Sequence, residues 1–202
     1  MMNEKVKELG CTDGTHFANP SGLNDDTQVV SAYDMAIIAQ AAFNNSDVFG
    51  NFQYQVYKLA PTQNNPSGAT CANEHRLIIT DDETSELYCP EAKAGKTGYT
   101  SLAGNTLVTC AERDGITLIA VVLNGHQSHY RDTKALFDFG FSNFQSLKAA
   151  DHETTYRSLE NDMTIAGMTA KDSISLSLDP DSRVILPREA VRFRTLIPVF
   201  RL

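Results

Sequence analysis

The sequence predicts an α+β protein in which helices cover an antiparallel sheet, followed by a small β-rich domain. Helical patterns come first, then a strand around residue 96, a β-hairpin and a closing helix, an order typical of such sheets. The charge balance then shifts near residue 147, because residues 1–146 hold 9 basic and 17 acidic side chains whereas residues 147–202 hold 8 of each. We therefore expect two domains, 1–146 and 147–202, both incomplete.

Two helical patterns precede the first strand. Residues 2–9 place apolar side chains on one face and end at Gly10, which predicts a helix closed by a C-terminal glycine. The pattern has no clear beginning, and we expect the chain to be truncated at its N-terminus. Ser31 with Asp34 resembles a capping box, and the apolar spacing that follows predicts a helix over 32–44. A shorter helix is expected after it.

Strand patterns follow in the middle of the chain. We expect a strand over 53–59, a loop over 60–70, and a short strand or turn over 77–79. The clearest signal is the hairpin between 104 and 124, where Asp114-Gly115 joins two β-prone runs and is a pair typical of two-residue turns.

The last third of the chain changes from helix to short strands. A closing helix is expected from Ser128, acting as its cap, to about residue 144. Its expected inner face consists of Leu136, Phe137 and either Phe139 or Phe141. Short β-type runs are expected at 153–159, 173–178 and 182–186, separated by polar turns such as Asp179–Asp181.

Composition excludes several classes of function. The net charge is −8, which argues against nucleic acid as a partner because phosphate contacts need a cationic face. No run approaches the roughly 18 apolar residues of a membrane span, and the first residues lack the apolar segment of a secretory signal. The 42% hydrophobic content is enough for a packed core.

The four cysteines fit no paired metal-binding spacing. Cys110 lies in an apolar strand pattern and is expected to be a buried thiol. Cys71 and Cys89 bracket one segment, and the sequence leaves open whether they form a disulfide or remain thiols.

The most informative motif is Lys96-Thr97-Gly98. Lys-Thr-Gly accompanies Ser-x-x-Lys and a Ser-x-Asn element in penicillin-binding proteins and class A β-lactamases. Neither a Ser-x-x-Lys nor a Ser-x-Asn occurs in these 202 residues. The chain therefore reads as the downstream part of an acyl-transfer enzyme without its nucleophile.

The surroundings of this motif resemble the serine D-alanyl-D-alanine carboxypeptidases, the low-molecular-mass penicillin-binding proteins of peptidase family S11. The landmarks, in family order, are His16–Leu23, Gly95–Thr100, Ala111–Gly115 and Leu118–Gly125. The resemblance implies a β-lactamase/transpeptidase-like fold, an extracytoplasmic location, no cofactor, and action on peptidoglycan stem peptides ending in D-Ala-D-Ala. It also implies binding of β-lactams.

The resemblance assigns roles to four catalytic-segment residues. Lys96 supplies a positive charge for the terminal carboxylate of the substrate, and the Thr97 hydroxyl donates a hydrogen bond to it. Gly98 lets the substrate approach closely. The Tyr99 N–H is expected to be one of two oxyanion donors. An extended peptide would pair with this edge strand.

Two further residues are expected to bind substrate. Arg131 matches a family position that helps to hold the carboxylate, although it equally fits a surface helix arginine paired with Asp132 or Asp138. His75 lies in a segment near the site, where the family more often has asparagine.

His16 is expected to fix its loop by a hydrogen bond. His126 and His129 lack a third ligand, so no metal site is expected.

Three functions remain as alternatives. The first is a D,D-carboxypeptidase that acts through an acyl-enzyme, of which this chain alone would be inactive. The second is a non-catalytic peptidoglycan-peptide-binding or structural module. The third is a hydrolase related to the β-lactamases, which share Lys-Thr-Gly.

Overall fold

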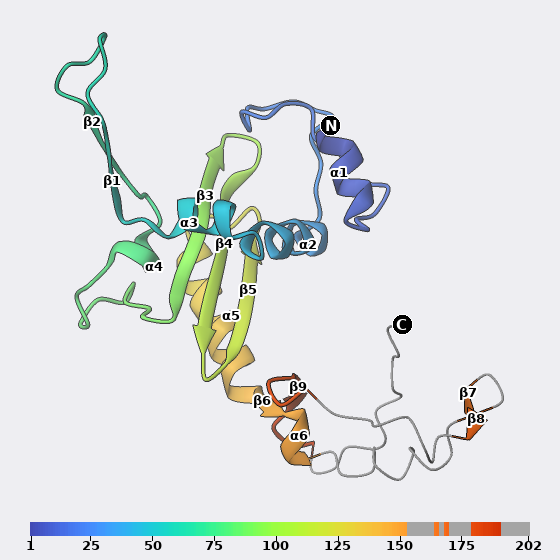
Figure 1. The fold of residues 1–202 in the computed structure, drawn as a ribbon. Helices are drawn as coiled ribbons and strands as arrows, with labels where there is room; N and C mark the ends of the chain where they lie inside the picture. Colours follow the sequence, from blue (N-terminus) through green and yellow to red (C-terminus); the bar gives the residue numbers. More distant parts are fainter. Residues whose placement is uncertain (153–163, 166–167, 170–178, 191–202) are drawn as a thin grey trace. The chain divides into compact units, whose positions relative to one another are not determined.

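The structure is a computed structural model that describes residues 1–152, 164–165, 168–169 and 179–190 (Figure 1). The chain divides into two compact units, one of residues 1–113 and 117–140, the other of residues 114–116 and 141–202. The domain boundary after residue 146 stays a prediction. The runs expected at 153–159 and 173–178 lie outside the described residues.

A three-stranded sheet forms the centre of the first unit. It consists of β3 (Ala92–Thr100), β4 (Gly104–Arg113) and β5 (Ile116–Val122), with β4 in the middle (Figure 1). The predicted hairpin is confirmed. Asp114 and Gly115 have φ angles of 53° and 73°, and two left-handed residues in succession give a turn whose twist matches that of paired strands.

Strand β3 has an open edge. It pairs antiparallel with β4, from Ala94 opposite Cys110 to Thr100 opposite Gly104, with one irregularity between Ala92 and Ala94. Among the described residues β3 pairs with no other strand. One row of its backbone groups is therefore available to an extended ligand.

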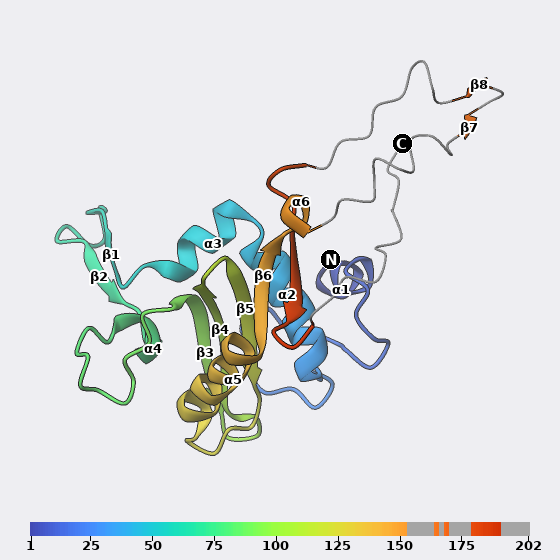
Figure 2. The ribbon, with the colours of Figure 1, turned by 90° about the horizontal axis from the view of Figure 1, so that it is seen from below.

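Helices cover both faces of this sheet. Helices α2 (Ala32–Phe43) and α3 (Ser46–Gln53) lie over one face, and α5 (His129–Asn143) lies over the other, as Figures 1 and 2 show together. Gly140 of α5 packs closely on Leu118, because a Cβ at Gly140 would lie 2.5 Å from the leucine Cδ1. The buried apolar side chains of the sheet include Ala94, Leu107, Cys110, Ala111, Ile116 and Ala120.

The inner face of α5 differs in part from the prediction. Phe137 and Phe141 are buried, as expected, but Leu136 and Phe139 are exposed. Residues four apart lie on the same side of a helix, so a register that buries both phenylalanines turns Leu136 outward. Including Leu136 in the inner face was wrong.

The start of α2 is capped, but not by a complete capping box. The Ser31 hydroxyl accepts a hydrogen bond of 3.0 Å from the Asp34 N–H, as predicted. The Asp34 carboxylate also interacts with Ser31, but its short hydrogen bonds run to the preceding loop. It is buried and accepts hydrogen bonds from the hydroxyls of Thr12 and Thr15 at 2.6 and 2.5 Å. These bonds, that of Thr12 first, lower the pKa of Asp34 to about 2.

The first helix also matches the prediction. Helix α1 (Met2–Glu8) is followed by Gly10 with a φ angle of 79°, the left-handed conformation expected after a helix end. Val6 is its buried residue.

Between α3 and β3 the chain forms a projecting hairpin and one helical turn. The hairpin pairs β1 (Val56–Leu59) with β2 (Ala69–Ala72), and it extends away from the sheet in Figure 1. Strand β2 was not expected. Residues 77–79 belong to α4 (Arg76–Ile79), a turn of helix rather than a strand, in which Leu77 and Ile78 are both buried.

The second unit contains short elements. Strand β6 (Phe144–Lys148) pairs antiparallel with β9 (Arg183–Pro187), which confirms the run expected at 182–186. The turn before it is closed by the Ser182 N–H, which donates to the Asp179 carbonyl at 3.1 Å. The other elements are α6 (Ala149–His152), β7 (Thr164–Ile165) and β8 (Met168–Thr169).

All four cysteines are free thiols in the structure. Cys110 is buried, as predicted, and burial raises the pKa of its thiol. Cys71 is exposed on β2, whereas Cys89 is buried. Within the described part of the chain, no helix combines the length and the apolar character that crossing a bilayer requires.

Candidate active site

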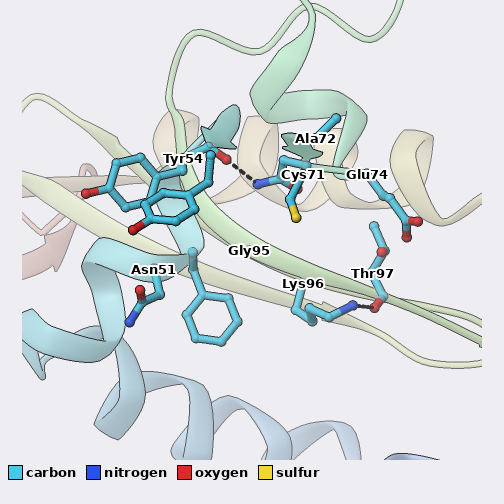
Figure 3. A pocket seen from close by; sticks show the side chains of 11 residues that line it. Asn51, Tyr54, Cys71, Ala72, Glu74, Gly95, Lys96 and Thr97 are labelled. Carbon is cyan, nitrogen blue, oxygen red and sulfur yellow. Dashed lines mark hydrogen bonds between the residues drawn. The ribbon is translucent and has the colours of Figure 1, made fainter. Parts of the chain in front are cut away.

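The Lys96–Tyr99 segment lies on the open edge strand β3. Lys96 is exposed, and its Nζ donates a hydrogen bond of 2.6 Å to the Thr97 carbonyl, so the ammonium group is held along its own strand (Figure 3). Thr97 and Gly98 are half-buried, and the side chain of Tyr99 is 72% exposed. The motif therefore faces solvent along its whole length.

Two hollows flank this segment and share Glu74, Lys96 and Thr97. The first, of about 400 Å³, is lined by all four motif residues. Its lining is Glu74, Lys96, Thr97, Gly98, Tyr99, Asn105, Thr106, His129 and Tyr130. The second, of about 370 Å³, adds an aromatic wall, with Tyr54 and Glu74 on opposite sides of Lys96 in Figure 3. Its lining is Asn51, Phe52, Tyr54, Tyr57, Cys71, Ala72, Asn73, Glu74, Gly95, Lys96 and Thr97.

A third hollow, of about 340 Å³, continues at the far end of the same strand. It includes Thr100 and the turn residues Leu102 and Ala103, with Asp25 and Asp26 from the loop that follows His16. Hollows thus accompany β3 from Gly95 to its end. This arrangement suits an extended ligand rather than a compact one.

The two glycines of β3 are required by packing. A Cβ at Gly95 would lie 2.5 Å from the Val108 carbonyl and 2.6 Å from the ring of His75. A Cβ at Gly98 would collide with the hydroxyl of Thr106, its partner across the strand pair. Packing against Thr106 is therefore one reason for a glycine here, and the expectation that Gly98 lets substrate approach closely stays a prediction.

His75 does not reach the hollows. It is 0% exposed, and its Nε2 forms a hydrogen bond of 2.8 Å with the Thr109 hydroxyl on β4. Burial lowers the pKa of His75 to about 4, so the ring is neutral at physiological pH. The expectation that His75 contacts substrate is wrong for this structure, because the segment that carries it turns into α4 and points the ring behind β3.

Tyr130, at the start of α5, joins the segment around His75 to the site. Its hydroxyl donates to the Glu74 carbonyl at 3.2 Å and accepts from the Arg76 N–H at 3.3 Å. Its ring lies edge-on to that of His75, with centroids 6.0 Å apart. Tyr130 also lines the first hollow.

Arg131 remains a prediction as a substrate-binding residue. Its side chain is 84% exposed, and its Nε lies 3.9 Å from a carboxylate oxygen of Asp132. Its neighbours His129 and Tyr130 line the first hollow, whereas Arg131 does not. A surface position of this kind leaves the guanidinium free to reach a ligand or to stay in solvent.

His16 fixes its own loop. The Nδ1 of His16 lies 2.9 Å from the Thr27 carbonyl, and its backbone pairs with Val29, which confirms the expected loop-fixing role. In the described residues, no group of three or more histidine, cysteine or acidic side chains converges as a metal site would require.

Sequence reasoning missed much of the lining. Glu74 and Tyr130 directly adjoin His75 and Arg131, which the sequence did single out, so the local backbone conformation decides which neighbour faces the site. The aromatic wall comes from α3 and the hairpin before β3, where the sequence pattern suggests only surface elements. Adjacency to expected site residues was the available signal.

The fold is that of the transpeptidase-like penicillin-binding proteins. The crystal structure of a Mycobacterium tuberculosis D-alanyl-D-alanine carboxypeptidase matches with a TM-score of 0.58 and 28% identity over 70% of this chain and 52% of that one. A structure of the Streptomyces K15 DD-transpeptidase gives a TM-score of 0.61 and 26% identity over 70% and 53%. Penicillin-binding protein D2 of Listeria monocytogenes, solved with cefotaxime bound, gives a TM-score of 0.56 and 25% identity over 69% and 53%.

The chain belongs to the D-alanyl-D-alanine carboxypeptidase family, peptidase family S11, whose family model matches residues 1–127. Among curated relatives, the M. tuberculosis carboxypeptidase DacB2 is 33% identical over 148 residues, which are 70% of this chain and 47% of the relative. The Escherichia coli carboxypeptidase DacA is 30% identical over 190 residues, 93% of this chain and 42% of the relative. The chain spans about half the length of these relatives or less.

Proposed function

We propose that this chain is part of a serine-type D-Ala-D-Ala carboxypeptidase that acts on peptidoglycan stem peptides, outside the cytoplasm and through an acyl-enzyme. The observation that carries the proposal is the open edge of β3, where Lys96 and Thr97 lie between two solvent-filled hollows. Family membership supports the reaction type, and the site needs no cofactor for it.

The edge of β3 suits an extended peptide as an added strand. Main-chain hydrogen bonds to β3 orient the scissile carbonyl, and the hollows beside Gly95–Tyr99 accept alternate side chains. The Lys96 ammonium exchanges the Thr97 carbonyl for the terminal carboxylate of the peptide, which is a stronger acceptor. The Thr97 hydroxyl adds a hydrogen bond, and Arg131, near the start of α5, is a second cation for the carboxylate.

The covalent step needs a serine beyond this chain. The serine hydroxyl attacks the carbonyl of the penultimate D-Ala, its proton passes to a base, and the terminal D-Ala leaves as the amine. Water then hydrolyses the ester. The Tyr99 N–H and the N–H of that serine stabilise the oxyanion. These 202 residues hold neither Ser-x-x-Lys nor Ser-x-Asn, so the chain alone binds the peptide without cleaving it.

Titration calorimetry with a blocked tripeptide ending in D-Ala-D-Ala tests the proposal. We expect saturable binding, and at least about tenfold weaker binding of the same peptide with an amidated C-terminus, because a charge-assisted hydrogen bond is lost. Lys96→Met removes the ammonium at the site. Lys93→Met is the matched control, since Lys93 is exposed on the same strand and bonds the Pro90 carbonyl instead.

The variants decide between the outcomes. Lys96→Met should weaken peptide binding about tenfold or more, and Lys93→Met should leave it unchanged. Equal affinity for the acid and the amide, or equal loss in both variants, would contradict a carboxylate anchor at Lys96. Tight binding together with peptide release by the chain alone would contradict the need for a serine outside it.

A further inference from the structure

His75 occupies an enclosed place directly behind the Lys-Thr-Gly segment. Its side chain is 0% exposed, and it lies between β3, β4 and the start of α5. The ring lines none of the three hollows described along β3, and the proposed chemistry gives it no task. A histidine is an unusual choice for such a site, because a buried imidazole needs hydrogen-bond partners.

The ring of His75 is in close contact with Gly95, the residue before Lys96. A single added methyl group at Gly95 would lie 2.6 Å from both Cδ2 and Nε2 of the ring. The absence of a side chain at this position therefore brings the backbone of β3 directly onto the imidazole. Any displacement of the ring changes the support of β3 one residue before the Lys96 ammonium.

The ring is held through its Nε2, and the backbone around it is held by other side chains. Its Nε2 is bonded to the Thr109 hydroxyl at 2.8 Å, and Thr109 is the residue opposite Gly95 in the strand pair. The His75 N–H donates to the Asn73 side-chain oxygen at 2.9 Å. The Tyr130 hydroxyl bonds the backbone on both sides of His75, at Glu74 and Arg76. The bond to Thr109 thus orients the imidazole relative to β3, and the backbone bonds fix the segment that carries it.

The charge state of the ring suits this place. Burial is the main cause that lowers the pKa of His75, and electrostatic interactions with His129 on α5 and Lys96 on β3 lower it further. A neutral ring adds no positive charge next to the Lys96 ammonium. The ammonium therefore keeps its attraction for a carboxylate without competition from behind the strand.

We propose that His75 is a positioning residue. Its hydrogen bond to Thr109 and its contact with Gly95 fix the backbone of the Lys96–Gly98 segment in the position needed to hold a peptide carboxylate. This inference rests on the proposed function of that segment. It differs from a simple core-filling role, because it assigns the effect to the orientation of the ring and not only to its volume.

A set of buried hydroxyl variants separates the two roles. Thr109→Val removes the bond to the ring while keeping the shape of the side chain, and Thr109→Ser retains the hydroxyl. Thr133→Val is the matched control, since Thr133 on α5 is also 0% exposed but its hydroxyl has no partner among the described residues. His75→Leu replaces the ring by an apolar side chain that fills the core without the hydrogen bond.

The first measurement needs no ligand. Amide chemical shifts in two-dimensional NMR spectra report the local geometry of Gly95–Gly98. We expect Thr109→Val and His75→Leu to move these resonances, and Thr109→Ser and Thr133→Val to leave them in place. The second measurement is the affinity for the tripeptide ending in D-Ala-D-Ala, which we expect to fall at least fivefold in the first two variants only.

The comparison of the Thr109→Val and Thr133→Val spectra decides whether the inference holds. If Thr109→Val moves the Gly95–Gly98 resonances no more than Thr133→Val does, His75 only fills the core and the inference fails. If His75→Leu does not fold, the two Thr109 variants decide alone. If the unmodified chain binds no peptide, the proposed function fails, and the amide resonances still show whether the ring positions the strand.

Discussion

The carboxylate of Asp34 accepts a hydrogen bond of 2.6 Å from the hydroxyl of Thr12, 22 positions earlier in the chain. Together with the bond from Thr15, it fixes the loop after α1 to the first turn of α2. The pKa of Asp34 is lowered to about 2, first by the Thr12 hydroxyl. Its stabilising contribution is therefore present above pH 4 and is lost as the pH falls toward 2.

Thr15→Val tests the strength of this connection. The substitution removes one of the two hydroxyls that donate to the same buried oxygen of Asp34, so we expect the free energy of unfolding to fall by about 1–3 kcal/mol. Urea denaturation measures it. Thr27→Val is the control, because Thr27 makes the same type of bond to Asp25 at an exposed site, and there we expect a change within about 0.5 kcal/mol. Equal effects at both sites would contradict the role of burial.

Stability should depend on pH through His75. The pKa of the buried ring is about 4, whereas an unfolded histidine titrates near 6.5, so between these values the unfolded chain binds the additional proton. Stability should therefore fall as the pH is lowered from 6.5 to 4, by on the order of 3 kcal/mol from this residue. Denaturation of the unmodified chain and of His75→Leu at several pH values measures the difference. The slope in this window should be much smaller in the variant, and identical slopes would show that His75 is not buried in its neutral form.

Gly98 and Thr106 should be energetically coupled. Gly98→Ala places a Cβ against the Thr106 hydroxyl, and we expect a loss of about 1–3 kcal/mol from overpacking. In a Thr106→Ala background the same change should cost markedly less, because the colliding atom is gone. A double-mutant cycle of unfolding free energies measures this coupling. Additive effects would mean that the glycine is needed for another reason, such as close approach of a ligand.

Labelled penicillin should not acylate this chain covalently. A serine nucleophile requires an activating base, and none of the serines here stands in a Ser-x-x-Lys sequence. Denaturing electrophoresis after incubation with a fluorescent penicillin should show no labelled band at 22.2 kDa. A full-length family member serves as the positive control. A stable label on this chain would identify an activated serine and would contradict the proposal that the nucleophile comes from outside these residues.

Local sequence signals were reliable where chemistry within a few residues decides the structure. Ser31 caps α2, and Asp114-Gly115 forms the turn of the β4–β5 hairpin, since both depend only on adjacent backbone groups. Strands β2 and β6 were missed because their pairing partners lie elsewhere in the chain. The open edge of β3 was expected from the Lys-Thr-Gly motif and is found.

Tertiary contacts decided the residues that the sequence placed wrongly. Asp34 looked like a capping residue, yet the Thr12 and Thr15 hydroxyls draw its carboxylate inward. His75 looked like a surface ligand, yet the helical turn α4 directs it behind Gly95. No pattern in the sequence shows which side chain of a short polar segment turns toward the interior.

The internal bond from the Lys96 ammonium to the Thr97 carbonyl makes recognition a competition between two acceptors. A hydrogen bond to the oxygen of a neutral amide is no stronger than the bond that the ammonium already makes to the Thr97 carbonyl. A hydrogen bond to a carboxylate is roughly twice as strong. Ligands without a terminal negative charge therefore gain little at Lys96, whatever contacts they make in the hollows along β3. An ionic-strength series should accordingly weaken acidic peptides and leave their amides almost unaffected.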